Sequence, residues 1–98
     1  MKVYVTYDVS GKHPEVKEGM QQRGYKDRWQ ANDETYHLPN TCLWKSNVSS
    51  LEREVADLED IVNEINVGLP VHERVQIKRC IVLMASPWAG ITGSDERP

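Results

Sequence analysis

The sequence predicts an α+β fold whose elements follow in the order strand, helix, strand, strand, helix, strand. Three observations support this: an alternating apolar and polar segment at the start, a segment of helical periodicity over residues 49–69, and a second strand-like segment after it. The 98 residues suffice for one domain. We expect that domain over residues 1–86, followed by a C-terminal tail over residues 87–98 that contacts a partner subunit.

The composition is that of an ordinary globular protein, with 39% hydrophobic and 28% charged residues. No apolar run approaches the roughly 20 residues needed to cross a membrane, and the start is a strand pattern without a signal-peptide cleavage region. We therefore expect a cytoplasmic protein without a membrane partner. The net charge of −3 argues against a strongly basic nucleic-acid-binding surface but permits a local basic patch.

The first strand is expected over residues 2–9, where apolar and polar side chains alternate. One side carries Val3, Val5, Tyr7 and Val9, and the other carries Lys2, Tyr4, Thr6 and Asp8. A short polar helix follows: Pro14 suits a first helical turn, and Gly24 stands where a helix ends. Gly19 in its middle weakens this helix by about 1 kcal/mol relative to alanine.

A hairpin of two strands is expected in the middle of the chain. Pro39 and Asn40 form a turn signal between the segments ETYHL and TCLWK, and both segments are rich in β-branched or aromatic residues. Residues 26–33 before them either extend the second strand or form a loop.

The clearest helix covers the segment SSLEREVADLEDIVNEINVGL. Its apolar positions recur at steps of three and four, at Leu51, Val55, Leu58, Val62, Ile65 and Leu69. Ser49 with Glu52 fits a capping box, and Gly68 ends the helix. The last strand lies within residues 73–86, where we expect a bulge at Arg79 and, over residues 80–84, cover on both faces.

This order of elements is the ferredoxin-like βαββαβ plan, a four-stranded antiparallel sheet with both helices on one face. The first strand then lies at the centre, between the third and fourth strands. Cys42 and Cys80 would be one whole strand apart, which is beyond the reach of a disulfide, and their spacing does not suggest a metal site.

On this plan Asp8 lies on the sheet face opposite the helices, at the end of the central strand. If two copies pair through these faces, their Asp8 carboxylates approach each other and a hard divalent cation such as Mg²⁺ relieves the repulsion. The alternative is that Asp8 caps the turn that follows it, since aspartate often bonds its own backbone two residues on.

The segment YVTYDVS resembles the N-terminal strand of the small CRISPR-associated adaptation protein, the second Cas subunit. The segments YHLPNTCLWKS and SPWAGI resemble the SinR-like branch of the same superfamily. The resemblance implies a ferredoxin-like homodimer in which Asp8 takes part in Mg²⁺-dependent nuclease activity. Residues 34–37 depart from the family, because they replace its run resembling Ser-Val-Phe-Glu.

A second candidate site is the segment RGYKDRWQ, in which Arg23, Lys26 and Arg28 alternate with Tyr25 and Trp29. Basic groups attract phosphate and aromatic rings stack on bases, so these residues are candidates for nucleic-acid binding. The alternative is that Trp29 belongs to the core and the charges form a solvated rim.

We therefore expect a nucleic-acid-associated homodimer, with Trp88 as an anchor on the partner and with metal-dependent nuclease activity at Asp8. A dimer would use the open sheet face, the edge of the last strand, or both. One alternative is a nucleic-acid-binding or toxin–antitoxin-type module without catalysis. Another is a domain that binds a small ligand or another protein.

Overall fold

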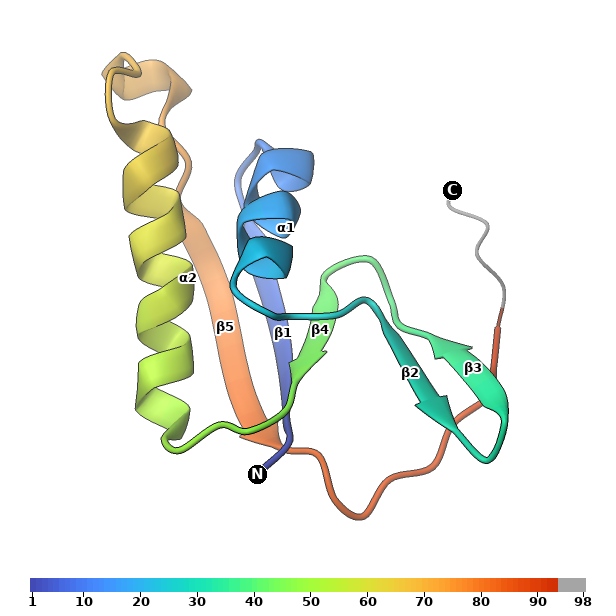
Figure 1. Cartoon of the computed structure of the whole chain (residues 1–98). Coiled ribbons are helices and arrows are strands. Elements are labelled where there is room, and N and C mark those ends of the chain that lie inside the picture. The colour runs from blue at the N-terminus through green and yellow to red at the C-terminus, as the bar shows by residue number, and fades with distance from the viewer. Residues whose placement is uncertain (94–98) are drawn as a thin grey trace.

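Strand β1 (Val3–Val9) lies at the centre of a three-stranded antiparallel sheet in the computed structural model, which describes residues 1–93 (Figure 1). The strand order is β4-β1-β5, with β4 at Cys42–Lys45 and β5 at Ile77–Met84. The remaining elements are helix α1 (His13–Gln22), strands β2 (Arg28–Ala31) and β3 (Glu34–His37), helix α2 (Leu51–Asn66) and a 3₁₀ turn at Val71–Glu73. The predicted α+β class and the central place of the first strand are confirmed.

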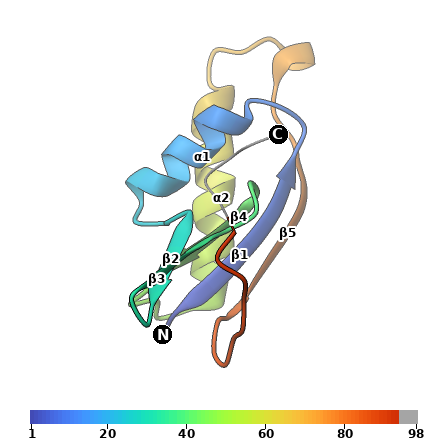
Figure 2. The ribbon, with the colours of Figure 1, turned by 90° about the vertical axis from the view of Figure 1, so that its right-hand side faces the viewer.

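The alternation in β1 sorts its side chains between two environments. Val3, Val5, Tyr7 and Val9 are buried, and the residues between them are half-buried. The buried side packs with Val16 and Met20 of α1 and with Leu58 of α2, so the core lies between the sheet and the helices. Figure 2 shows both helices on the same side of β1 and β5. We call the other side of the sheet the open face.

The two helices approach each other closely at Gly19. A Cβ atom at this position would lie 2.8 Å from the Cγ2 atom of Ile61, which is a buried residue of α2. The glycine that weakens α1 in isolation therefore allows the close packing of α1 against α2.

Helix α2 begins one residue later than the predicted capping box. Its N-cap is Ser50, whose hydroxyl accepts a hydrogen bond from the Arg53 N–H at 3.4 Å. The choice of Ser49 was wrong because two adjacent serines offer the same capping chemistry and the sequence does not distinguish them. Helix α2 ends at Asn66, and Gly68 adopts a positive φ of 81° just after it.

The predicted four-stranded sheet is wrong, and so is the hairpin at Pro39. Strand β3 pairs with β2 in a separate two-stranded sheet, whereas β4 pairs with β1. The turn between β2 and β3 is formed by Asn32 and Asp33, both in the left-handed region with φ of 53° and 62°. Asparagine and aspartate tolerate that conformation, and a two-residue turn of this kind has the twist that a hairpin needs.

The place of the missing fourth strand, beside β4, is taken by a single bridge. Lys26 and Trp44 exchange two backbone hydrogen bonds, of 2.8 and 3.0 Å. The chain then leaves the sheet and enters the β2–β3 hairpin, which stands to one side of the sheet in Figure 1. The segment at residues 26–33 therefore makes a single bridge to the sheet and then forms β2 and the hairpin turn.

Strand β5 is exposed where cover on both faces was expected. The exposed fractions of Ile81, Leu83 and Met84 are 59%, 46% and 57%. Ile81 and Leu83 pair with Thr6 and Tyr4 of β1, and therefore lie on the open face. The expected irregularity is confirmed within one residue, because Asp8 pairs with Arg79 and Val9 pairs with Ile77, which leaves Lys78 as the extra residue.

After β5 the chain folds back beside the β2–β3 hairpin. The backbone carbonyl of Thr92 accepts a hydrogen bond from the N–H of His37 at 2.9 Å. Residues 94–98 of the predicted tail lie outside the described residues. Within the described part of the chain, neither helix has the length and apolar character that a bilayer crossing requires. Both cysteines are free thiols, as expected.

Candidate functional site

Asp8 lies on the open face, at the end of the central strand, as the sequence predicted. It is paired with Arg79 of β5, whose guanidinium lies 3.9 Å from the Asp8 carboxylate. The Asp8 side chain is 40% exposed and that of Arg79 is 81% exposed, so both are accessible to solvent. The turn after β1 is held by Ser10, whose hydroxyl accepts from the Gln76 N–H at 2.8 Å and whose N–H donates to the Gln76 carbonyl at 2.9 Å.

Among the candidate residues, Asp8 is the one whose side chain is a carboxylate and could therefore bind a metal ion. Among residues 1–93, there is no group of three or more His, Cys, Asp or Glu side chains arranged to hold a metal. Protein-bound Mg²⁺ takes one or two carboxylates and completes its octahedron with water or phosphate oxygens. A single Asp8 beside an arginine is therefore a poor Mg²⁺ site within one chain.

The basic and aromatic residues of the segment RGYKDRWQ do not form one surface. The Arg23 guanidinium lies 3.0 Å from the carboxylate of Asp57 and 3.2 Å from that of Glu64, both on α2. Arg28 lies 3.2 Å from the neighbouring Asp27. Arg23 therefore joins helix α2 to the loop after α1, and of the candidate nucleic-acid-binding residues it is the one turned toward the helices.

Trp29 is the centre of an aromatic cluster on the other side of the molecule. Its ring centroid lies 4.6 Å from that of Trp44 and 5.2 Å from that of Trp88. Tyr36 contacts Trp88 as well, with centroids 5.0 Å apart and an interplanar angle of 81°. The alternative interpretation, in which Trp29 belongs to the core, is confirmed, because only 6% of Trp29 is exposed. Trp88 contacts its own hairpin, and its role as a partner anchor stays a prediction.

Two lysines lie over these rings. The ammonium group of Lys2 is 5.2 Å from the ring centroid of Trp29 and 5.7 Å from that of Trp44. Lys26 contributes a third such contact, 5.4 Å from the Trp44 ring. Cation–π attraction holds both ammonium groups near the aromatic cluster. Sequence reasoning missed Lys2, because it is distant in the chain from the segment with alternating basic and aromatic residues.

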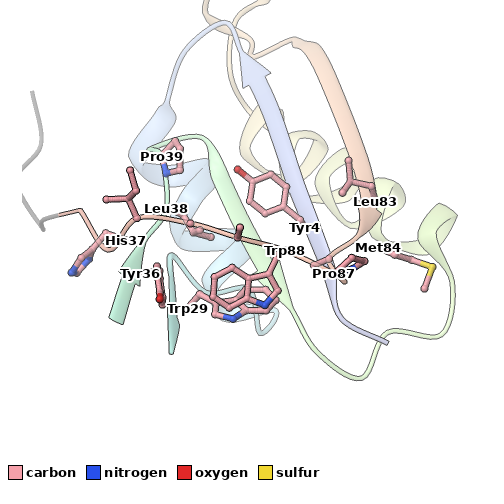
Figure 3. A pocket seen from close by; sticks show the side chains of 14 residues that line it. Tyr4, Trp29, Tyr36, His37, Leu38, Pro39, Leu83, Met84, Pro87 and Trp88 are labelled. Atoms are coloured by element: carbon pink, nitrogen blue, oxygen red, sulfur yellow. The ribbon is translucent and has the colours of Figure 1, made fainter. Parts of the chain in front are cut away.

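A cavity of about 370 Å³ opens between the open face, the β2–β3 hairpin and the C-terminal segment. We call it the aromatic cavity. Figure 3 shows Trp88 over Trp29, with Tyr36 beside them and with Tyr4 and Leu83 across the cavity on the sheet. Burial, and then the nearby Cys42, raise the pKa of Tyr4, so its hydroxyl keeps its proton at neutral pH.

A buried polar network lies on the opposite side of the sheet, and sequence reasoning missed it too. Glu54 is 3% exposed, accepts a hydrogen bond from the hydroxyl of Tyr25, and lies 3.5 Å from the ammonium of Lys45. Burial, and then the hydrogen bond to Glu54, raise the pKa of Tyr25 far above its usual range. Glu54 falls one turn after Leu51 and one turn before Leu58, on the apolar side of α2. This position in the sequence could have indicated that Glu54 is buried.

The chain was compared with protein families, curated proteins and solved structures. No family model, no curated protein and no solved structure matches it.

Proposed function

We propose that the protein is a nucleic-acid-associated homodimer of the kind formed by the CRISPR-associated adaptation protein and the SinR-like branch of its superfamily. The observation that supports this most is the position of Asp8, a solvent-accessible carboxylate at the end of the central strand, on the opposite side of β1 from the buried core residues. The sequence resemblance implies a functional carboxylate at this position.

A pairing of two open faces accounts for the apolar surface beside Asp8. Ile81 and Leu83 are exposed on the strand that neighbours β1. A two-fold axis through the Asp8 end of this surface would bury Ile81 against its counterpart, leave Leu83 at the aromatic cavity, and bring two Asp8 side chains toward each other. The two carboxylates would then repel unless a divalent cation were held between them.

Mg²⁺ at such a site would supply charge neutralisation for a phosphodiester group and a bound water of lowered pKa. The part of Asp8 is to hold the cation. The exposed guanidinium of Arg79, 3.9 Å away, is placed to pair with a phosphate oxygen of the same substrate.

The experiment that tests this function compares Asp8→Asn with Asp33→Asn. Both variants lose one accessible carboxylate, but Asp33 lies in the hairpin turn, where asparagine tolerates the φ of 62°. We expect Mg²⁺-dependent cleavage of single-stranded RNA or DNA by the wild type and by Asp33→Asn, and loss of cleavage in Asp8→Asn. Equal cleavage by all three proteins would show that Asp8 is wrongly assigned.

Light scattering of the same proteins measures the molar mass in solution. We expect the mass of a dimer for the wild type at micromolar concentration. A monomeric wild type would contradict the pairing of open faces.

A nucleic-acid-binding protein without catalysis is the second candidate. The observation in its favour is that Asp8 has Arg79 rather than a second acid as its neighbour within the chain. It predicts salt-dependent binding without cleavage, weakened by Lys26→Ala more than by Arg23→Ala, because Arg23 is paired with the carboxylates of α2.

A further inference from the structure

We infer that the aromatic cavity binds an unstacked nucleobase of a single-stranded nucleic acid, and that Lys2 and Lys26 meet the adjoining phosphates. The inference rests on the proposed association with nucleic acid. It adds a second site, separate from Asp8, and names the form of nucleic acid that this site takes.

The cavity has the size and lining of a small-ligand site. Its volume of about 370 Å³ lies within the range of roughly 300–1,000 Å³ that is usual for such sites. Four aromatic rings line it from four separate segments, namely Tyr4 of β1, Trp29 of β2, Tyr36 of β3 and Trp88 of the C-terminal segment. A planar ring is the ligand shape that such walls accommodate best.

Trp88 offers a surface for stacking. It meets Trp29 at an interplanar angle of 60° and Tyr36 at 81°, so both contacts are tilted or edge-on. With 43% of Trp88 exposed, its indole is available to a base. The hydrogen bond of 2.9 Å between the His37 N–H and the Thr92 carbonyl fixes the C-terminal segment to the hairpin, so the platform is preorganised.

The charges around the cluster favour a ligand that carries phosphate. Lys2 lies 5.2 Å from the ring of Trp29, which lines the cavity, and Lys26 lies 5.4 Å from the adjacent ring of Trp44. These ammonium groups attract an anion and repel a cationic ligand that would otherwise suit an aromatic cage. One carboxylate, that of Glu34, accepts a hydrogen bond from the cavity residue Tyr36 at 3.0 Å and opposes these two ammonium groups. The balance of charge favours a nucleotide over a quaternary ammonium compound.

The two sites lie on the same face of the sheet. Tyr4 and Asp8 point to the same side of β1 and are four residues apart, which corresponds to about 13 Å. A single strand is required, because a base must leave its stack to enter the cavity.

The test measures the binding of a fluorescein-labelled oligodeoxythymidine of about eight nucleotides, a length within the usual site sizes for single strands. Fluorescence anisotropy gives the Kd for the wild type, Trp88→Ala and Trp88→Phe. We expect Trp88→Ala to weaken binding about tenfold or more, because it removes a stacked base contact. Trp88→Phe should retain most of the affinity, and this variant guards against a fault in folding.

Lysine variants test the phosphate contacts with a matched control. Lys2→Ala and Lys26→Ala should each lower the slope of log K against log salt by about 1. Arg53→Ala removes the same charge from an exposed residue in the first turn of α2, on the helix side of the sheet, and it should leave the slope unchanged. Equal slopes for all three variants would overturn the assignment of Lys2 and Lys26.

Titration of the wild type with thymidine monophosphate reports on the aromatic cluster, because all three tryptophans belong to it and two of them, Trp29 and Trp88, line the cavity. We expect quenching of tryptophan fluorescence, reduced in Trp88→Ala. Oligonucleotide binding that is equal in the wild type and Trp88→Ala would overturn the cavity site while the proposed function stands. Absence of any binding would overturn both. Quenching by tetramethylammonium instead, or a dimer that Trp88→Ala converts to a monomer, would give the cavity to another occupant and also overturn the inference.

Discussion

The two faces of the central sheet differ in what their side chains are used for. On the helix face, the buried side chains of β1 pack against α1 and α2, and the charged groups there are paired. On the open face, apolar side chains of β5 are exposed, an aromatic cavity is formed, and Asp8 is paired loosely with Arg79. The difference teaches that side chains of the helix face are used in packing and charge pairing, whereas those of the open face stay accessible, which is what the proposed binding role requires.

Charge shows the same difference. Arg23 and Lys45 lie within 4 Å of acidic groups of α2, so their charges are largely neutralised on the helix side. Lys2 and Lys26 lie instead over aromatic rings, which attract an ammonium group without neutralising its charge. A net negative chain can therefore present a positive surface beside the cavity.

The largest expected contrast compares Leu58→Ala with Ile81→Ala. Leu58 is fully buried in the core of the helix face, so its truncation should lower the free energy of unfolding by about 2–5 kcal/mol. Ile81 is 59% exposed, and its truncation should change the free energy of unfolding of the monomer by less than about 0.5 kcal/mol. Urea denaturation of both variants checks this. A loss at Ile81 as large as that at Leu58, at a dilution where light scattering gives the mass of a monomer, would contradict the exposure of Ile81 within one chain.

The next contrast compares two charged pairs. Glu54→Ala removes the partner of the buried Tyr25 hydroxyl and of Lys45, and should lower the free energy of unfolding by about 2 kcal/mol. The loss should not be larger, because Asp57 also lies near both groups. Arg79→Ala breaks an exposed pair of 3.9 Å and should cost less than about 0.5 kcal/mol. Thermal unfolding followed by circular dichroism measures both. Similar melting temperatures for the two variants would contradict the structural role of the network.

The smallest contrast uses two glycines. Gly19→Ala adds a methyl group 2.8 Å from Ile61 and should destabilise by about 1 kcal/mol, because overpacking outweighs the gain in helix propensity. Gly90→Ala places its methyl group at ordinary contact distance, 3.5 Å from Tyr36 and 3.6 Å from Trp88, and should be close to neutral. Chemical denaturation measures the free energy of unfolding of both variants. A stabilised Gly19→Ala would show that α1 and α2 are not in close contact.

The sequence predicted the parts of this fold that depend on local periodicity. The alternation in residues 2–9 identified the central strand and the side on which Asp8 lies, and the spacing from Leu51 onward identified α2. It predicted both neighbours of the central strand but not the partner of residues 34–37, because Pro39 looked like a stronger turn signal than the pair Asn32 and Asp33. Pairing depends on backbone conformation and distant contacts, which a short window of sequence does not contain.

The candidate sites divide in the same way. Asp8 was found because strand alternation alone determines its face. The aromatic cavity was not found, because its walls come from β1, the hairpin and the segment after β5, and only the tertiary fold brings them together. Trp29 and Trp88 were each noticed separately, one as a base-stacking residue and the other as a partner anchor.

The most direct test of the central claim is a nuclear magnetic resonance titration of the ¹⁵N-labelled protein with the oligodeoxythymidine. The account predicts that the largest changes in amide chemical shift occur in β1, in the β2–β3 hairpin and at residues 85–92. The amide resonances of α2 should not shift. Shifts centred on α2, or an unchanged spectrum at saturating oligonucleotide, would contradict the claim that the open face is the binding face of this protein.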